Sequence, residues 1–218
     1  HRVSDMLSDS PLWPMMLFDL AIAYRHPPYD HLHLTTYVDY RRYRVPGGTY
    51  FFTVNLLERR QETLVRHIDN LREAVRKTRN ERPFHIDAWV VLPDHLHCIW
   101  TLPPSDDDFS TLESDKIRFV QAIPRIERRS QTRISKGERG IWQRRFWEHV
   151  IRDERDYAQH IDFIHVNPLK HGYVTQVKDW PYSTFHRYVA AGLLPADWCG
   201  ELTDVPSEDQ WDKLDSMT

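Results

Sequence analysis

Two histidines separated by one leucine, His95 and His97, form the motif in this sequence with the clearest capacity for chemistry. In a β-strand, residues two apart project from the same face, so both imidazoles would point together. Two imidazoles on one face can hold a divalent metal ion, but a complete site needs a third ligand and open positions for a substrate. The same spacing occurs at His31 and His33, where no apolar strand precedes it, and we interpret that copy as a coincidence.

A predicted helix that begins after Asp153 offers the third ligand. Asp153 is a favourable N-cap, and the helix is expected to end at Asn167 because a residue before proline, here Pro168, is disfavoured in helical geometry. Phe163 and Asn167 are four residues apart and therefore share one face of this helix. The side-chain oxygen of asparagine is a suitable ligand for a hard cation.

The segments around these motifs alternate between strand-like and helix-like patterns. Strands are expected at 47–56, 84–92, 95–102 and 141–151, and helices at 61–80, 111–134 with a break at Pro124, 153–167 and 183–191. This order predicts an α+β domain in which helices pack against an antiparallel sheet. Beyond Pro168 the chain is expected to be peripheral.

Composition restricts the class of protein. The chain has 218 residues, of which 40% are hydrophobic, enough for one domain with a real core and some extensions. No apolar run reaches the roughly 18 residues that a membrane-spanning helix needs. The two cysteines, Cys98 and Cys199, lie far apart, which favours a reducing compartment over a disulfide framework and predicts a cytoplasmic protein.

The formal net charge of −3 conceals two segments of opposite sign. Residues 116–145 contain ten lysines and arginines against two acidic residues, whereas residues 197–218 contain seven acidic residues against one lysine. A basic centre with an acidic end is typical of a domain that binds a polyanion, although a solvated helix face also explains a run of charge. The tail could compete with a polyanion for the basic surface.

Five segments in order along the chain resemble the REP-associated tyrosine transposases, and together they span about residues 40–200. They are PGGTYFFTV at 46–54, PDHLHCIW at 93–100, WQRRFWEH at 142–149, FIHVNPLKHG at 163–172 and WPYSTFHRY at 180–188. The resemblance implies the HUH endonuclease fold, a ferredoxin-like antiparallel sheet flanked by helices. We expect a leader at 1–38, the HUH domain at 39–175, and an extension with the acidic tail at 176–218.

The resemblance also implies a mechanism. His95, His97 and Asn167 would bind Mg²⁺ or Mn²⁺, which polarises the scissile phosphate of single-stranded DNA. A tyrosine on the helix would attack that phosphate, leaving a 5′-phosphotyrosine and a free 3′-OH, so that rejoining needs no ATP. The implied substrate is DNA folded into the imperfect hairpins of repetitive extragenic palindromes (REP), with a short guide sequence at the 5′ foot. No membrane partner is expected, and a monomer is favoured over a dimer.

The chain departs from the family at the nucleophile. The tyrosine expected four residues before the amide ligand is Phe163, which keeps the ring and lacks the nucleophilic oxygen. Three interpretations remain: an engineered Tyr→Phe change that holds DNA uncleaved, a natural inactive copy, or replacement of the nucleophile by Tyr157. Tyr157 is six residues away, and roughly 600° of helical turn places it on another face.

Basic residues on either side of the histidine motif are candidates for DNA contacts. Arg41, Arg42 and Arg44 precede the first strand and could bind phosphates or read guanines. Arg144 and Arg145 alternate on the last predicted strand, so one of them could face the site.

Aromatic residues and further histidines are weaker candidates. Tyr50 and Trp147 could stack on unpaired bases, although core packing explains an aromatic residue at least as well. Of the remaining histidines, His160 or His165 is expected near the metal.

Two other functions fit the same motifs. One is a zinc hydrolase in which Glu148 or Asp94 completes the histidine pair, because Asn167 is a poor zinc ligand. The other is a non-catalytic protein that binds hairpin DNA, which the phenylalanine at 163 would suit. Metal preference distinguishes the first alternative, and restoring the tyrosine tests the second.

Overall fold

A computed structural model describes residues 44–125, 127–137 and 139–200 of the chain. The predicted leader, Arg41 and Arg42, the histidine copy at 31 and 33, and the acidic tail from residue 201 onward lie outside the described residues. In the part of the chain that the structure describes, no helix is long and apolar enough to cross a membrane.

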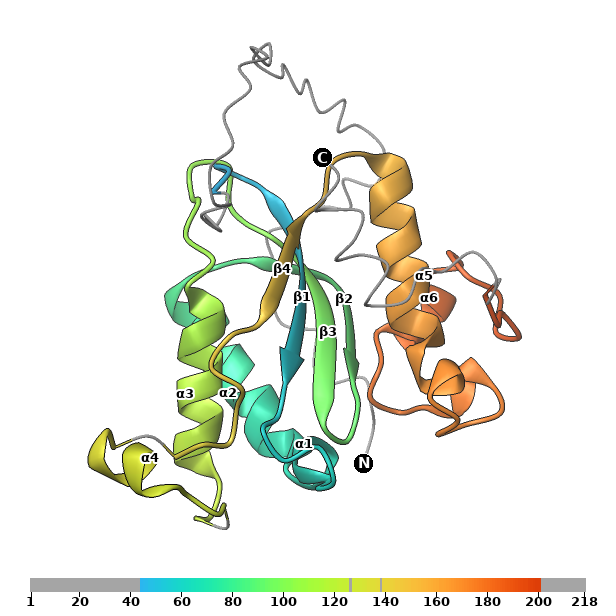
Figure 1. Cartoon of the computed structure of the whole chain (residues 1–218). Coiled ribbons are helices and arrows are strands. Elements are labelled where there is room, and N and C mark those ends of the chain that lie inside the picture. The colour runs from blue at the N-terminus through green and yellow to red at the C-terminus, as the bar shows by residue number, and fades with distance from the viewer. Residues whose placement is uncertain (1–43, 126, 138, 201–218) are drawn as a thin grey trace, which may run out of the picture. The chain divides into compact units, whose positions relative to one another are not determined.

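Four strands form one antiparallel sheet, which confirms the predicted α+β class. They are β1 (Thr49–Asn55), β2 (His85–Val91), β3 (His95–Thr101) and β4 (Trp147–Val150), in the spatial order β2-β3-β1-β4 (Figure 1). β2 and β3 form the predicted hairpin. β1 and β3 lie at the centre of the sheet and pair along their full lengths.

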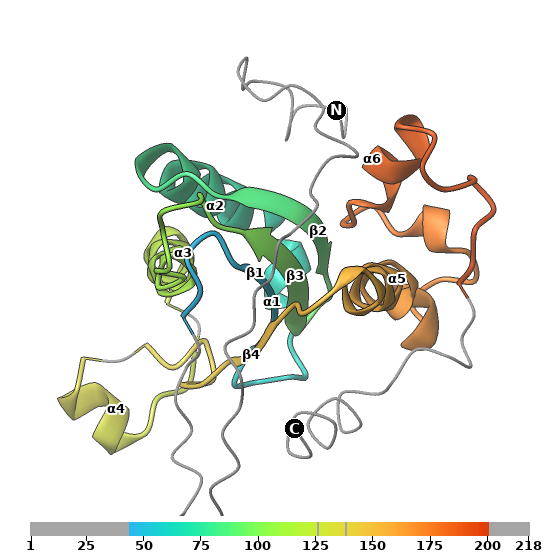
Figure 2. The same cartoon turned by 90° about the horizontal axis from the view of Figure 1, so that it is seen from above.

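Helices cover both faces of the sheet. The helices α2 (Ile68–Glu81) and α3 (Thr111–Ala122) lie against one face, and α5 (Glu154–Lys170) lies against the other (Figures 1 and 2). Because side chains alternate along a strand, β1 supplies both cores: Tyr50 and Phe52 pack on the α2 and α3 side, and Phe51 packs on the α5 side. The sheet is therefore buried on both faces.

Two predicted helices are divided in the structure. The segment expected at 61–80 forms α1 (Thr63–Arg66) and α2, with a break at His67. The basic segment expected at 111–134 forms α3 and the short α4 (Gln131–Ser135), as predicted from Pro124, because Ile123 before the proline is extended. The segment that carries α4 projects away from the sheet in both views.

The predicted end of the last long helix at Asn167 is wrong, because α5 continues through Pro168 to Lys170. Proline removes one helical hydrogen bond, but Pro168 lies on the buried face of α5, and tertiary packing there outweighs the local preference. The His171 N–H still donates to the Asn167 carbonyl oxygen at 3.0 Å. Phe163, Asn167 and the start of the following turn consequently lie on one continuous helical face.

The fourth strand is shorter than the predicted 141–151. β4 covers only Trp147–Val150, and Trp142 makes an isolated bridge to Leu56. Between them the chain bends at Arg144, so the prediction that Arg144 and Arg145 alternate on a strand is wrong.

The segment after α5 is not peripheral, contrary to expectation. The Val91 N–H donates to the Tyr182 carbonyl oxygen at 2.9 Å, and the Thr184 N–H donates to the Trp89 carbonyl oxygen at 2.8 Å. These bonds pair the segment with the outer edge of β2 and satisfy backbone groups that an edge strand would otherwise expose. The segment continues through a 3₁₀ turn (Val177–Asp179) and α6 (Phe185–Ala190), in which Phe185 is fully buried.

The pH dependence of stability should reveal one buried acid, Asp115 on α3. Burial raises the pKa of Asp115 to about 7, and Thr78 and Arg118 oppose this only partly. Between pH 4 and pH 7 the folded chain therefore keeps a proton that the unfolded chain releases, so its stability falls as pH rises. We expect Asp115→Asn to remove this loss, with a stability gain that grows across this pH range to as much as about 4 kcal/mol.

Urea unfolding at pH 4.5, 6 and 8 gives the free energy of unfolding of Asp115→Asn and of the unaltered chain. The difference between the two at each pH is the gain, because the titration of all other groups cancels. A gain that is the same at every pH would contradict the raised pKa of Asp115.

Candidate functional site

The predicted histidine pair lies on the α5 face of β3. His95 and His97 are both buried, with ring centres 5.0 Å apart and planes at 82° to each other. Leu96 and Cys98 point into the core on the opposite side, as the alternation of a strand requires.

Each histidine is held through Nδ1. His95 Nδ1 lies 2.7 Å from Asp94 Oδ1, and Arg59 Nε donates to Asp94 Oδ2 at 2.7 Å. Burial by itself would raise the pKa of Asp94, but hydrogen bonds from His95 and Arg59 outweigh it and lower the pKa to about 2. The ionised carboxylate can only accept, so His95 carries its proton on Nδ1 and presents the Nε2 lone pair.

The second ring, His97, is oriented by β1. Its Nδ1 lies 2.9 Å from the Thr53 hydroxyl oxygen, across the β1–β3 pairing in which these two residues are direct partners. Burial holds the pKa of His97 well below its ordinary value, and repulsion from a protonated His95 or His171 would lower it further. The ring is therefore neutral near pH 7, which is the form that ligates metals.

One face of α5 lies opposite the pair. The ring of Phe163 is 4.9 Å from the ring of His97, and the ring of His171 is 5.1 Å from the ring of His95. Asn167 is midway between 163 and 171 at helical spacing of four, so it lies opposite the two histidines. The structure therefore brings together His95, His97, Phe163 and Asn167 as the sequence predicted.

Buried polar atoms at this site lack partners. Among the described residues, neither His95 Nε2 nor Asn167 Oδ1 has a hydrogen bond, although both atoms are buried. A buried polar atom without a partner is costly and requires an explanation such as a missing ion or water. Two imidazoles and an amide oxygen, converging from a strand and a helix, form a donor set that suits a divalent cation with open positions.

Phe163, at the position where the sequence predicts the nucleophile, is 1% exposed. Its ring meets His97 and Phe51 edge-on, and Lys170 Nζ lies 5.2 Å from its centre. The ring packs as a tyrosine ring would, but no oxygen is present to attack phosphorus.

Tyr157 cannot stand in for the missing tyrosine in this arrangement. Its hydroxyl donates to Asp87 Oδ1 at 3.1 Å, and Asp87 also accepts from Thr101, at the far end of β3 from His95. Six strand residues correspond to about 20 Å. Burial and the adjacent Asp87 also raise the pKa of Tyr157 well above its ordinary value, which disfavours the nucleophilic phenolate.

A second cluster, formed by His149, Asp156 and His160, lies near the start of α5. His149 Nε2 is 2.8 Å from Asp156 Oδ2, and His160 Nδ1 is 2.8 Å from the Asp156 carbonyl oxygen. The two imidazole rings are stacked with planes 16° apart, so their in-plane lone pairs run side by side rather than converging on one ion. We interpret the cluster as a hydrogen-bonded link between β4 and α5.

The expectation that His160 or His165 lies near the metal stays a prediction. The centre of the Phe51 ring lies 4.6 Å from the centre of the His160 ring and 5.7 Å from the centre of the His97 ring. His165 packs instead against Phe185 and Tyr188, and burial lowers its pKa to about 3.

The two carboxylates of the zinc-hydrolase alternative are placed elsewhere. Asp94 supports His95 from behind through Nδ1. Glu148 pairs with Phe52 across β1 and β4, on the face of the sheet that carries α2 and α3. Neither can complete the histidine pair as a third ligand without rearrangement.

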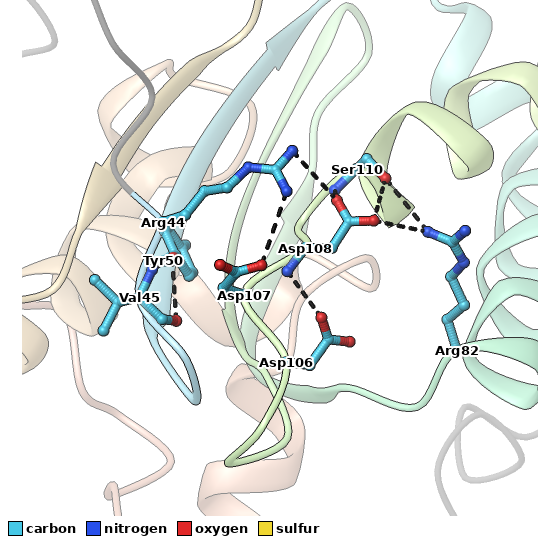
Figure 3. Close-up of polar contacts among 8 residues, drawn as sticks. All are labelled: Arg44, Val45, Tyr50, Arg82, Asp106, Asp107, Asp108 and Ser110. Atoms are coloured by element: carbon cyan, nitrogen blue, oxygen red, sulfur yellow. Dashed lines mark hydrogen bonds and ion pairs between the residues drawn. The ribbon is translucent and has the colours of Figure 1, made fainter.

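Two of the residues expected to contact DNA are engaged within the fold. Tyr50 is fully buried, and its hydroxyl accepts from the Val45 N–H at 2.7 Å, so the prediction that it stacks on bases is wrong (Figure 3). The same view shows Arg44 directed at Asp107 and Asp108, at 3.8 Å and 3.7 Å. Arg44 also precedes Thr49, which lies at the end of β1 away from the histidines.

The other described candidates remain at the surface. Arg144 and Arg145 are exposed. Trp147 is half-buried on the α5 side, where its ring meets Phe51 and stacks on His149. All three positions are at least partly exposed.

Sequence reasoning missed the supporting residues Arg59, Thr53 and His171. Arg59 and His171 lie outside any regular apolar pattern, so no periodicity identified them. Thr53 could have been found, because a residue on the central strand two positions from Phe51 must share the face of the site.

The comparisons with known proteins agree with this architecture. No family model matches the chain. The chain is 53% identical over 167 residues to a REP-associated tyrosine transposase of Escherichia coli strain K12, covering 76% of this chain and 93% of that protein. It is 46% identical over 164 residues to a putative REP-associated tyrosine transposase of Haemophilus influenzae, covering 74% and 93% of the two chains.

A solved structure described as a REP-associated tyrosine transposase bound to a REP hairpin aligns with a TM-score of 0.66 and 52% identity. The alignment covers 76% of this chain and 93% of that one. The sheet, the histidine pair and the facing helix thus define a transposase of the HUH type. Within that class, the chain belongs to the REP-associated tyrosine transposases.

The support of His95 by Asp94 generates a prediction about metal binding. Asp94→Asn removes the carboxylate that fixes the proton on Nδ1, so we expect the affinity for Mn²⁺ to fall about 10- to 100-fold. Asp69→Asn, at an exposed position on α2, is the matched control and should leave the affinity unchanged. Titration with Mn²⁺ followed by electron paramagnetic resonance measures the affinity of each variant. Equal affinities of Asp94→Asn and Asp69→Asn would contradict the role of Asp94.

Proposed function

We propose that this chain is a transposase of single-stranded DNA carrying REP-type hairpins, in which Phe163 leaves binding intact and prevents cleavage. The observation that carries the proposal is the placement of Phe163 against His97, one helical turn from Asn167. A related protein of known structure is bound to a REP hairpin, which supports the choice of substrate. A monomeric state and a cytoplasmic location remain predictions of the sequence.

The residues of the site fit Mg²⁺ or Mn²⁺. His95 and His97 would hold it through Nε2, and Asn167 through Oδ1. Bound there, such an ion supplies a Lewis acid that polarises the scissile phosphate and stabilises charge on the departing oxygen.

The chain's own residues would position the reaction. A tyrosine at 163 would lose its hydroxyl proton as its oxygen bonds to phosphorus, and the P–O3′ bond would break as the departing oxygen takes up a proton. The product is a 5′-phosphotyrosine and a free 3′-OH. Lys170, whose Nζ lies over the ring at 163, places a positive charge beside the reacting phosphate.

A non-catalytic hairpin binder is the second candidate function, and Phe163 is the observation that favours it. Such a binder would have lost other parts of the catalytic site as well, whereas a blocked transposase would lack only the hydroxyl at position 163. The supporting contacts of both histidines are in place, which favours a block at one atom.

The basic segment before β4 supports binding to DNA. Arg139 holds the two ends of this segment together. It donates to both carboxylate oxygens of Glu127, at 2.7 Å and 2.8 Å, and to the carbonyl oxygens of Ile123 and Pro124, at 3.0 Å and 2.7 Å. Other basic residues of this segment are exposed, including Arg125, Arg128, Lys136, Arg144 and Arg145. A segment that is fixed at its ends and carries exposed lysine and arginine side chains is suited to bind the phosphates of a hairpin stem.

Restoring the nucleophile tests the proposal directly. We expect no cleavage and no covalent adduct with the unaltered chain on a labelled REP-type hairpin in Mn²⁺. Phe163→Tyr should cut the strand and leave a 5′-linked protein–DNA adduct visible on a denaturing gel. The change adds one hydroxyl to a ring that already occupies the site, so both proteins should bind the hairpin.

Two further variants sharpen the result. Phe163→Tyr combined with His97→Ala should not cut, and Phe163→Tyr combined with Tyr157→Phe should cut normally. Cleavage by the unaltered chain would refute the role of position 163. A failure of Phe163→Tyr to cut, with binding retained, would establish the non-catalytic alternative.

Arg144 and Arg145 should contribute to binding through phosphates. We expect Arg144→Ala with Arg145→Ala to weaken hairpin binding and to reduce the slope of log affinity against log salt by up to about 1.8. Arg76→Ala with Lys77→Ala, on the exposed side of α2, is the matched control, because both residues pair with Glu73. Fluorescence anisotropy between 50 and 200 mM salt measures the slope; equal slopes for both double variants would exclude a contact at 144 and 145.

A further inference from the structure

A row of aromatic rings leads from the histidine site to the surface. The His171 ring, 5.1 Å from His95, is followed by Tyr173 at 5.9 Å, and Tyr173 is followed by Trp180 at 5.4 Å. The Tyr173 and Trp180 rings are stacked, with planes 30° apart. We call these two residues the aromatic ledge.

The ledge is exposed and yet firmly held. Tyr173 is 42% exposed, whereas Trp180 is half-buried and its Nε1 donates to the Val91 carbonyl oxygen at 3.0 Å. The Tyr173 N–H donates to the Pro168 carbonyl oxygen at 3.0 Å, directly after Gly172 turns the chain with a positive φ of 71°. Both rings are therefore fixed in place before any ligand arrives, which lowers the entropic cost of binding.

Charges of both signs lie near the ledge. Arg59, with a side chain that is 48% exposed, is paired with Asp94 at 2.7 Å. Burial and the charges of Asp94 and Glu62 raise the pKa of Tyr173, and the charge of Arg59 opposes them. Lys170 and Lys178 are exposed on the neighbouring turns. A single exposed aromatic ring is ordinary on a protein surface. A stacked, anchored pair of rings with exposed lysines on the neighbouring turns, two ring contacts from His95, has the chemistry of a base-stacking platform.

We infer that the aromatic ledge binds an unpaired base of the DNA strand within a few nucleotides of the scissile phosphate. Tyr173 would meet the base with the part of its ring that His171 and Trp180 leave exposed, and Lys170 would contact an adjoining phosphate. This inference rests on the proposed function, because it presumes that a single strand passes the histidine pair. It adds a site that holds the strand by its bases, independently of the hairpin stem.

The test uses two DNA ligands and the full chain. One ligand is a REP-type hairpin with a single-stranded extension at its foot, and the other is the same hairpin without the extension. We expect Tyr173→Ala to weaken binding of the extended ligand about 5- to 100-fold and to leave the blunt ligand unchanged. Tyr173→Phe should bind like the unaltered chain, because stacking needs the ring and not the hydroxyl.

A scan of the extension identifies the stacked base. Replacing that nucleotide by an abasic one should weaken binding to the unaltered chain and have no further effect on Tyr173→Ala, whereas other abasic positions should act alike on both. A 2-aminopurine at the same nucleotide should be quenched by the unaltered chain and not by Tyr173→Ala. Ile117→Ala, an exposed apolar residue on α3, is the control for loss of surface.

Each outcome is decisive for the ledge. Equal losses on both ligands, additive effects of Tyr173→Ala at every abasic position, or unchanged affinity would overturn the inference. If the unaltered chain binds neither ligand, the proposed function fails instead, and the two failures are therefore distinguishable.

Discussion

The pairing of β1 with β3 is the constraint on which the rest of the site depends. In this register Thr53 lies opposite His97 and Asn55 opposite His95, so the hydroxyl that orients one imidazole comes from the neighbouring strand. A slip of one residue would turn both histidines into the core beneath α2 and α3. The slip is opposed because it would move Leu96 and Cys98 out of the core beneath α2 and α3 and put the two histidines there instead.

Much of this arrangement could be predicted from the sequence, because it follows from periodicity. The strand period of two places His95 and His97 together, and the helix period of four places Phe163 and Asn167 together. The extension of α5 through Pro168 could not be predicted, since packing of a buried face overrode a local preference. Arg59 was equally inaccessible, because its role depends on a contact with Asp94, 35 residues away along the chain.

Phe163 is held entirely by contacts of its ring. The ring meets His97, Phe51 and Lys170, and none of these contacts needs an oxygen. Packing at position 163 therefore requires an aromatic ring and does not require a hydroxyl group. The buried polar atoms of His95 and Asn167 lie beside this ring, so the polar and the aromatic parts of the site are built independently of each other.

The pairing of Tyr182 and Thr184 with the edge of β2 has a consequence for how the chain folds as it is made. These residues leave the ribosome roughly a hundred residues after β2, which at about 5–20 residues per second leaves the β2 edge open for several seconds. During that interval a half-finished sheet presents unsatisfied backbone groups to other nascent chains. Slow translation of the last third of the molecule would therefore favour aggregation, and the yield of soluble protein should depend on how quickly the segment after α5 is synthesised.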